Sequence, residues 1–310
     1  MAGSGIAERM VILKNENKAM IALVLGHFIW GVSFVFSKIC LTHTTPFIYI
    51  GQRFTIAIAL MGILIATGKV KVSFKGKKLG QLALLGLFEP VLYFVCENYG
   101  ILYTSATFSG MMIAMIPISS MAFAALFLGE RPSFLQILFS VVSVAGVVMV
   151  SVKGTGGEGA VPLKGVLLML GAVLTASGYQ LMTRKLSDEF TAFERTVFMF
   201  LEGAVVYVGL MLAENIRQPY AMVEPLMNGR YVVALLFQGT LSSVGAYFFQ
   251  NYATTYLPIN RVAPFANMTT AVSLFAGVVF LREPFGLVML PASLMILGGV
   301  WGVQKFAKKE

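Results

Sequence analysis

NYGILYTSATFSGMMIAMIPISSMAFAALFLGE, residues 98–130, returns in altered form at residues 251–283 of the same chain. The two copies align without a gap when the chain is shifted by 153 residues, and polar residues match at both ends of the frame. Leu and Phe match by chance in a hydrophobic chain, whereas polar anchors in one ungapped register rarely do. We interpret the stretch as part of an internal repeat. The matched pairs include Asn98 with Asn251, Tyr99 with Tyr252, Ser120 with Ser273, Phe127 with Phe280, and Glu130 with Glu283.

The composition places the chain in a lipid bilayer. Of its 310 residues, 57% are hydrophobic and 12% are charged, and the mean hydropathy is +0.82, so a water-soluble globule would leave too much apolar surface exposed. The net charge of +9 comes largely from lysines and arginines in short connections between apolar runs. This pattern favours anionic lipid headgroups as partners, and we expect no nucleic-acid partner.

Ten apolar segments are each close to the ~20 residues that a helix needs to cross a bilayer. They form two five-helix units, residues 19–152 and 164–306, which are joined by the Gly-rich segment 153–163 and flanked by a polar segment, 1–18, and a tail, 307–310. We therefore predict an all-α integral membrane protein. The predicted helices run from Ala19 to Leu41, Pro46 to Gly68, Leu79 to Leu102, Ala106 to Leu128, Phe134 to Val152, Lys164 to Thr183, Phe193 to Ala213, Tyr231 to Tyr252, Arg261 to Leu281 and Leu287 to Phe306.

Basic residues indicate the orientation. With the N-terminus inside, the inner segments hold fifteen lysines and arginines and the outer segments hold five, which predicts that both termini are cytoplasmic. Because each repeat has an odd number of spans, the second copy enters the membrane upside down. Inverted repeats of this kind are typical of secondary transporters that work by alternating access.

Several motifs carry a family resemblance. They are WGVSFVFSK at residues 30–38, NYGILYTSA at 98–106, FLGERP at 127–132 and FLREPF at 280–285. Together with ten spans in a five-plus-five duplication, they resemble the EamA branch of the drug/metabolite transporter superfamily. The resemblance covers essentially the whole chain. It implies a membrane transporter of amino acids, sugars, nucleobases or drugs, and leaves the substrate open.

An acidic stripe marks the third predicted helix. Glu89, Tyr93 and Glu97 are four residues apart and therefore lie on one helix face. Pro90 lies within the stripe and can kink the helix where a site would lie. The stripe either lines a cavity or pairs with Arg53. In the repeat frame its equivalents are also polar: Ser242 for Glu89, Tyr247 for Phe94, Gln250 for Glu97 and Asn251 for Asn98.

Other charged residues inside spans are costly and therefore informative. Arg53, in the second predicted helix, either holds an anionic substrate group or neutralises Glu97, and its place after Pro46 is part of the family resemblance, which favours the ion pair. Arg195 lies near the inner end of the seventh helix, and we expect it to extend to the headgroups. Glu202, in the middle of that helix, is either a proton carrier or a packing residue.

Aromatic and amide residues complete the candidate site. His27 and Trp30 lie one turn apart on the first helix, and each has an alternative role as a packing residue. Asn267 in the ninth helix has equal claims as a substrate contact and as an interhelical hydrogen-bonding residue. The candidates for substrate binding are His27, Trp30, Arg53, Glu89, Tyr93, Glu97, Tyr179, Tyr247, Gln250, Asn251 and Asn267, and those for proton coupling are Glu89, Glu97 and Glu202.

Small residues give weaker signals. Cys40 and Cys96 lie in apolar segments without CxxC spacing, so we expect small buried residues and leave a disulfide open. Gly298 and Gly302 have small-xxx-small spacing, which predicts close helix packing either within the chain or in a homodimer.

The sequence has no metal-binding motif, nucleotide-binding loop or nucleophile motif, so we expect no cofactor, no metal site and no enzymatic activity. We predict a secondary transporter in the cell membrane that exports or exchanges a small amphiphilic metabolite such as an amino acid, with protons as a candidate coupling ion. The alternatives are a channel-like carrier and a membrane-embedded enzyme acting on lipids.

Overall fold

The computed structural model describes residues 2–127, 132–154, 160–257, 262 and 265–306, and for residues 2–14 and 124 it describes the backbone alone. Within these residues the chain is helical and contains no β-strand. Eight helical stretches of the described chain are long and apolar enough to cross a membrane, and two shorter helices of 16 and 17 residues occupy the positions predicted for the ninth and tenth spans. The predicted all-α membrane architecture is confirmed.

The helices of each half follow the predicted order. The first half contains α1 (Ala2–Leu41), α2 (Pro46–Ala66), α3 (Leu79–Gly86), the π-helical turn η1 (Leu87–Leu92), α4 (Tyr93–Tyr103), α5 (Ala106–Ile113), α6 (Ile116–Phe127) and α7 (Phe134–Lys153). The second half contains α8 (Leu163–Lys185), α9 (Ala192–Asn215), the short 3₁₀ turns η2 (Pro219–Met222) and η3 (Glu224–Met227), α10 (Gly229–Phe237), the π-helical turn η4 (Gln238–Gly245), α11 (Ala246–Tyr256), α13 (Ala266–Leu281) and α14 (Met289–Lys305).

Local sequence explains where several helices begin. Pro46 opens α2, as proline is favoured in the first turn of a helix. α7 and α9 open with capping boxes, in which Ser133 pairs with Gln136 and Thr191 pairs with Glu194. α1 begins earlier than predicted because residues 2–18 contain no proline to stop the helix. The predicted end of the fourth span at Leu128 and the predicted start of the ninth at Arg261 lie outside the described residues.

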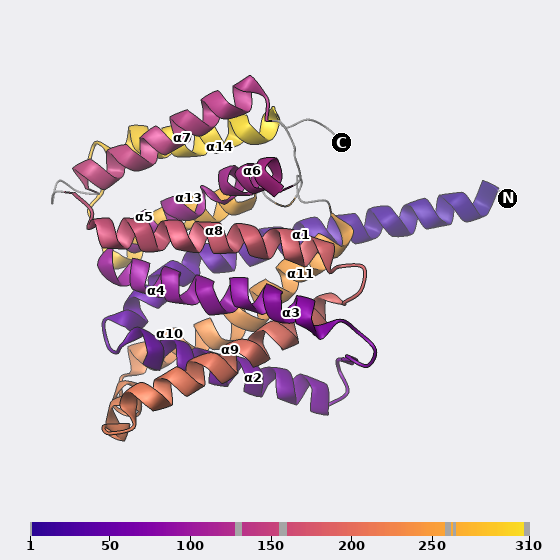
Figure 1. Cartoon of the computed structure of the whole chain (residues 1–310), viewed down its shortest axis with the longest axis horizontal. Helices are drawn as coiled ribbons and strands as arrows, with labels where there is room; N and C mark the ends of the chain where they lie inside the picture. The colour runs from indigo at the N-terminus through magenta and orange to yellow at the C-terminus, as the bar shows by residue number, and fades with distance from the viewer. Residues whose placement is uncertain (1, 128–131, 155–159, 258–261, 263–264, 307–310) are drawn as a thin grey trace.

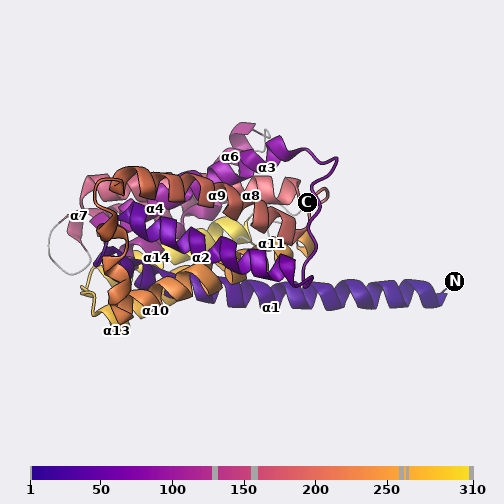
Figure 2. The ribbon, with the colours of Figure 1, turned by 90° about the horizontal axis from the view of Figure 1, so that it is seen from below.

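The two halves interleave. α1 packs against α11 and α13 of the second half, and α8 packs against α4 and α6 of the first half. Repeat-related helices also meet in pairs: α2 with α9, α5 with α13, and α7 with α14. This pattern is unchanged when the halves are exchanged, as an inverted repeat requires. α7 and α14 lie together along one edge (Figure 1), and the N-terminal part of α1 extends beyond the bundle (Figure 2).

Small residues allow the close approach of α7 and α14. A Cβ on Gly299 would lie 2.6 Å from the carbonyl oxygen of Phe139, and one on Gly146 would lie 2.8 Å from that of Ala292. Gly302 also packs against the Phe139 ring, whereas Gly298 faces open space. The predicted close packing therefore occurs within the chain, and the small-residue spacing does not require a second protomer.

The third and eighth spans are broken at repeat-related places. η1 interrupts the third span, and Glu89 within it has φ −148° and ψ 115°, far from helical values. Pro90 accounts for this, because the residue before a proline is pushed out of the helical region. η4 interrupts the eighth span at the equivalent depth without a proline. Irregular backbone at membrane depth is tolerated where it is buried in protein or lines a cavity.

Candidate functional site

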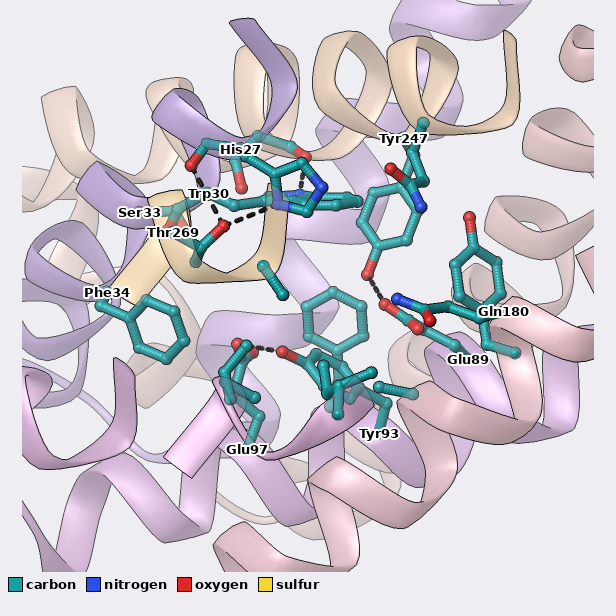
Figure 3. A pocket seen from close by; sticks show the side chains of 18 of the residues that line it. His27, Trp30, Ser33, Phe34, Glu89, Tyr93, Glu97, Gln180, Tyr247 and Thr269 are labelled. Atoms are coloured by element: carbon teal, nitrogen blue, oxygen red, sulfur yellow. Dashed lines mark hydrogen bonds between the residues drawn. The ribbon is translucent and has the colours of Figure 1, made fainter. Parts of the chain in front are cut away.

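A cavity of about 60 Å³ lies between the two halves, next to both helix breaks. Figure 3 shows its lining side chains, which come from α1, η1, α4, α8, α11 and α13, among other elements. Nine of the eleven residues predicted for substrate binding line this cavity. These nine are His27, Trp30, Arg53, Glu89, Tyr93, Glu97, Tyr179, Tyr247 and Gln250.

The acidic stripe contributes the carboxylates of the cavity. Glu89 and Glu97 are 5% and 6% exposed. The Tyr93 hydroxyl donates to Glu97 Oε1 at 2.8 Å, and the Tyr247 hydroxyl donates to Glu89 Oε1, a bond that joins the two halves (Figure 3). Of the two interpretations of the stripe, the structure favours the cavity lining.

Arg53 does not form the expected ion pair with Glu97. Its Nε donates to Ser243 Oγ at 2.8 Å, and its Nη2 donates to Ser242 Oγ at 3.2 Å. Its guanidinium carbon lies 4.4 Å from the centre of the Phe94 ring. Among the described residues the ion pair that forms is Lys77 with Glu194, at 2.6 Å and away from the cavity. The η4 break brings the two serines to Arg53, and sequence spacing could not show this contact.

Tyr247 is the centre of an aromatic wall. Its ring centroid lies 5.0 Å from that of Trp30, 5.3 Å from that of Phe200 and 6.1 Å from that of Tyr179. Trp30 donates from Nε1 to the carbonyl oxygen of Ser242 at 3.3 Å, which ties α1 to the η4 break. The cavity therefore has both an aromatic wall and an acidic wall.

His27 joins α1 to α13 at the edge of the cavity. It is 4% exposed, and its Nδ1 lies 2.8 Å from Thr269 Oγ1. A buried ring that is hydrogen-bonded to a neighbouring helix fits the packing role. Thr269, Ser33, Ser242 and Gln180 also line the cavity and were not singled out for it from the sequence. Gln180 directly follows Tyr179 in an apolar span, and a polar amide at that position could have been predicted to line the cavity.

Asn251 and Asn267 do not line the cavity. Asn251 is fully buried beside it, where it accepts from the Tyr179 hydroxyl at 3.1 Å and donates to Thr196 Oγ1 at 2.8 Å. Asn267 is half-buried on α13. Because Asn251 holds Tyr179 in place, it acts on the cavity through that ring.

Arg195 does not extend to the headgroups, and that prediction is wrong. Its side chain is 0% exposed and donates to the carbonyl oxygens of Thr183 at 2.5 Å and Asn251 at 2.7 Å. Thr183 lies in the last turn of α8, where carbonyl groups lack partners within the helix, whereas Asn251 lies in the middle of α11. Arg195 therefore fastens α9 to α8 and α11.

Glu202 lies outside the cavity lining. It is half-buried on α9, and its carboxylate packs against Gly86 at the end of α3. Its Oε2 atom is buried without a hydrogen-bond partner among the described residues. The structure thus separates Glu202 from Glu89 and Glu97.

A charged pair holds the turn between α4 and α5. Lys38 Nζ donates to the carbonyl oxygens of Ile101 and Thr104 at 2.8 and 2.6 Å, and Glu283 accepts from the backbone N–H groups of Ala106 and Thr107 at 2.7 and 2.8 Å. Each charge is placed at the helix end that it stabilises. Neither contact was predicted from the sequence.

The two cysteines are unpaired. Cys40 is buried in α1, and Cys96 is half-buried in α4. No disulfide joins them.

Comparisons with known proteins agree with this architecture. The model of the EamA-like transporter family matches residues 17–152 and 163–304. The uncharacterized transporter YcxC of Bacillus subtilis is 35% identical over 297 residues, which cover 94% of each chain. The probable terminal-alkyne amino-acid exporter of Streptantibioticus cattleyicolor is 26% identical, with 93% of this chain and 91% of that protein covered. One solved crystal structure aligns with a TM-score of 0.64 at 18% identity, over 94% of this chain and 98% of that one, and is similar in fold.

Proposed function

Since the chain belongs to the EamA-like transporter family, we propose that it is a secondary carrier that moves a small amphiphilic metabolite through the central cavity by alternating access. It is a multi-pass membrane transporter and not an enzyme. We propose that it lies in the cell membrane with both termini cytoplasmic, an orientation that the distribution of basic residues supports. A homodimer stays a prediction.

The observation that carries the proposal is the central cavity at the two helix breaks. Buried polar residues from both inverted halves converge there, and carriers built from inverted repeats place their sites at the repeat interface between broken helices. The cavity of about 60 Å³ is smaller than the roughly 300–1,000 Å³ of typical ligand sites. A metabolite therefore requires the two halves to rearrange before it can enter. Alternating access includes such a rearrangement, whereas an open channel does not.

An amino acid or a similar metabolite is the proposed substrate. One relative that spans most of the chain carries the name of an amino-acid exporter. The cavity combines carboxylates, a guanidinium group and aromatic rings, which suits a molecule with polar and apolar parts. Export or exchange is the proposed direction.

Protons are the proposed coupling ion, with Glu89 and Glu97 as carriers. Both carboxylates face the cavity together with Arg53 of α2, His27 of α1, Tyr93 of α4, Tyr179 of α8 and Tyr247 of α11. Glu202, which does not line the cavity, becomes the weakest of the three candidates.

Counterflow in proteoliposomes tests the proposal. A thermal-shift screen with amino acids, sugars, nucleobases and polyamines first identifies a ligand. We expect unlabelled ligand on the far side to accelerate uptake of the labelled ligand, and the Trp301→Phe variant, changed on an exposed face of α14, to behave the same way. Uptake that is independent of ligand on the far side would indicate a channel and contradict the carrier mechanism.

A further inference from the structure

The central cavity has more negative charge than its own cation balances. Among the described residues its lining contains two carboxylates, Glu89 and Glu97, and one arginine, Arg53, with no lysine. Burying a charge away from water is costly unless another group compensates it. With both carboxylates ionised, the cavity therefore lacks one positive charge.

Most of the hydrogen-bonding capacity of Arg53 is used within the protein. All three of its nitrogen groups are engaged: Nε with Ser243, Nη2 with Ser242, and Nη1 with the Tyr49 hydroxyl at 3.4 Å. One face of the guanidinium also covers the Phe94 ring. These contacts hold Arg53 at the η4 break and leave two of its five N–H donors for a substrate carboxylate.

The two carboxylates, in contrast, are engaged only by neutral partners in the described part of the chain. Tyr247 donates to Glu89, and Tyr93 donates to Glu97, with a long contact of 3.5 Å from Asn98 Nδ2 to the second oxygen of Glu97. Neither carboxylate forms an ion pair with another described residue. Their remaining acceptor capacity is available to a donor that enters the cavity.

Amide groups and aromatic rings of the cavity also favour a ligand that donates hydrogen bonds. The Oε1 atoms of Gln180 and Gln250 line the same cavity and are buried without hydrogen-bond donors among the described residues. Figure 3 shows the Glu89 and Gln180 side chains directed into the space below Tyr247. The rings of Trp30 and Tyr247, 5.0 Å apart, stand on the opposite side, and aromatic faces attract cations. The two carboxylates, the two amide oxygens and the two rings all suit a positively charged hydrogen-bond donor.

We propose that the cavity binds its substrate through an ammonium group, which lies between Glu89 and Glu97 beside Trp30 and Tyr247, and that a carboxylate on the substrate is not required. An ammonium group supplies three N–H donors and the missing positive charge. The inference rests on the proposed function, because it names the substrate group for the same cavity. It admits amines as well as amino acids and excludes simple carboxylates.

Trp30 offers a direct readout of binding. The chain has two tryptophans, and the other, Trp301, is 53% exposed on α14. In a Trp301→Phe variant the fluorescence therefore reports from the cavity alone. Two matched series separate the functional groups: leucine with isoamylamine and 4-methylpentanoate, and phenylalanine with phenethylamine and 3-phenylpropanoate. We expect each amine to bind at least as tightly as its amino acid, and the carboxylates to leave the fluorescence unchanged.

Charge-removing variants locate the ammonium group. Glu89→Gln and Glu97→Gln should each weaken amine binding by at least about tenfold, since each removes a buried charged partner. Glu202→Gln, outside the cavity, is the matched control and should bind normally. If a glutamine variant fails to fold, the fluorescence titrations of the parent protein with the two ligand series still test whether an ammonium group is required.

Binding of the carboxylates in preference to the amines, or no response to either amine, would overturn the inference. Counterflow of an amino acid without amine binding would contradict the inferred ammonium site and would leave the carrier mechanism intact. Amine binding without any counterflow would support the ammonium site and contradict the carrier mechanism instead.

Discussion

The third and eighth spans are repeat-related and broken at the same depth, yet their chemistry differs. The third carries Glu89, Pro90 and Glu97, while the eighth carries Ser242 and Gln250 in the places of the two glutamates. Arg53 of the first half is held by serines of the second, and Tyr247 of the second half donates to Glu89 of the first. The duplication therefore supplied two similar scaffolds, and the charges of the cavity were concentrated on one of them.

The helix ends show a closer correspondence between the halves. Lys38 on α1 donates to the carbonyl oxygen of Ile101, and Arg184 on α8 donates to that of Thr254 at 3.0 Å. Ile101 and Thr254 are equivalent in the repeat frame. Structural contacts at the ends are thus kept in both halves, whereas the residues at the breaks have diverged. Mutations at the two kinds of position should separate stability from transport.

The largest effect is expected for Arg53→Gln. It removes the only arginine or lysine of the described cavity lining and leaves Glu89 and Glu97 without a compensating cation. Breaking a buried charge network costs roughly 3–5 kcal/mol, so thermal unfolding in detergent should begin at a markedly lower temperature, and counterflow should be lost. The control Ser243→Ala removes two hydrogen bonds, one from Arg53 and one to the carbonyl oxygen of Gln238, and should cost roughly 1–3 kcal/mol. Equal losses in the two variants would show that Arg53 acts only by holding η4.

Arg195→Gln should come next, with an effect on stability alone. It leaves the carbonyl oxygen of Thr183 buried without its donor, which costs roughly 1–3 kcal/mol, whereas the carbonyl oxygen of Asn251 keeps its bonds from the Thr254 and Thr255 hydroxyls. Below the unfolding temperature the substrate concentration at half-maximal counterflow should match that of the parent. A shift in that concentration without a loss of stability would place Arg195 in the transport site.

These cases show what the sequence could and could not predict. The repeat, the ten spans and the stripe of Glu89, Tyr93 and Glu97 could be predicted because the repeat register, the lengths of apolar segments and the helical spacing are visible in the sequence itself. The partners of Arg53 and Arg195 could not, because they depend on which helix ends and breaks meet in space. Arg195 was placed at the headgroups from its position in the span, but its direction is set by its carbonyl acceptors on α8 and α11.

A smaller effect is expected when the chemical asymmetry of the two spans is removed. Glu97→Gln gives both spans the same amide at this place and should lower proton-driven exchange by at least about tenfold if Glu97 carries the coupling proton. Gln250→Asn, which shortens the equivalent residue without changing its charge, should lower exchange by about threefold or less. The measurement is uptake into proteoliposomes with and without an imposed pH gradient. A Glu97→Gln protein that still responds fully to the gradient would remove Glu97 from the coupling mechanism.

The smallest effect is expected for Glu202→Gln, which compares a membrane carboxylate outside the cavity with the two inside it. Glu202 packs against Gly86 beside the η1 break and is not among the described residues that line the cavity. Amide and carboxyl groups have nearly the same shape, so stability should change by about 1 kcal/mol or less. Exchange and its dependence on the pH gradient should match those of the parent. A flattened pH dependence in this variant, with Glu89→Gln and Glu97→Gln unchanged, would move the proton pathway out of the cavity and onto the contact between α9 and α3.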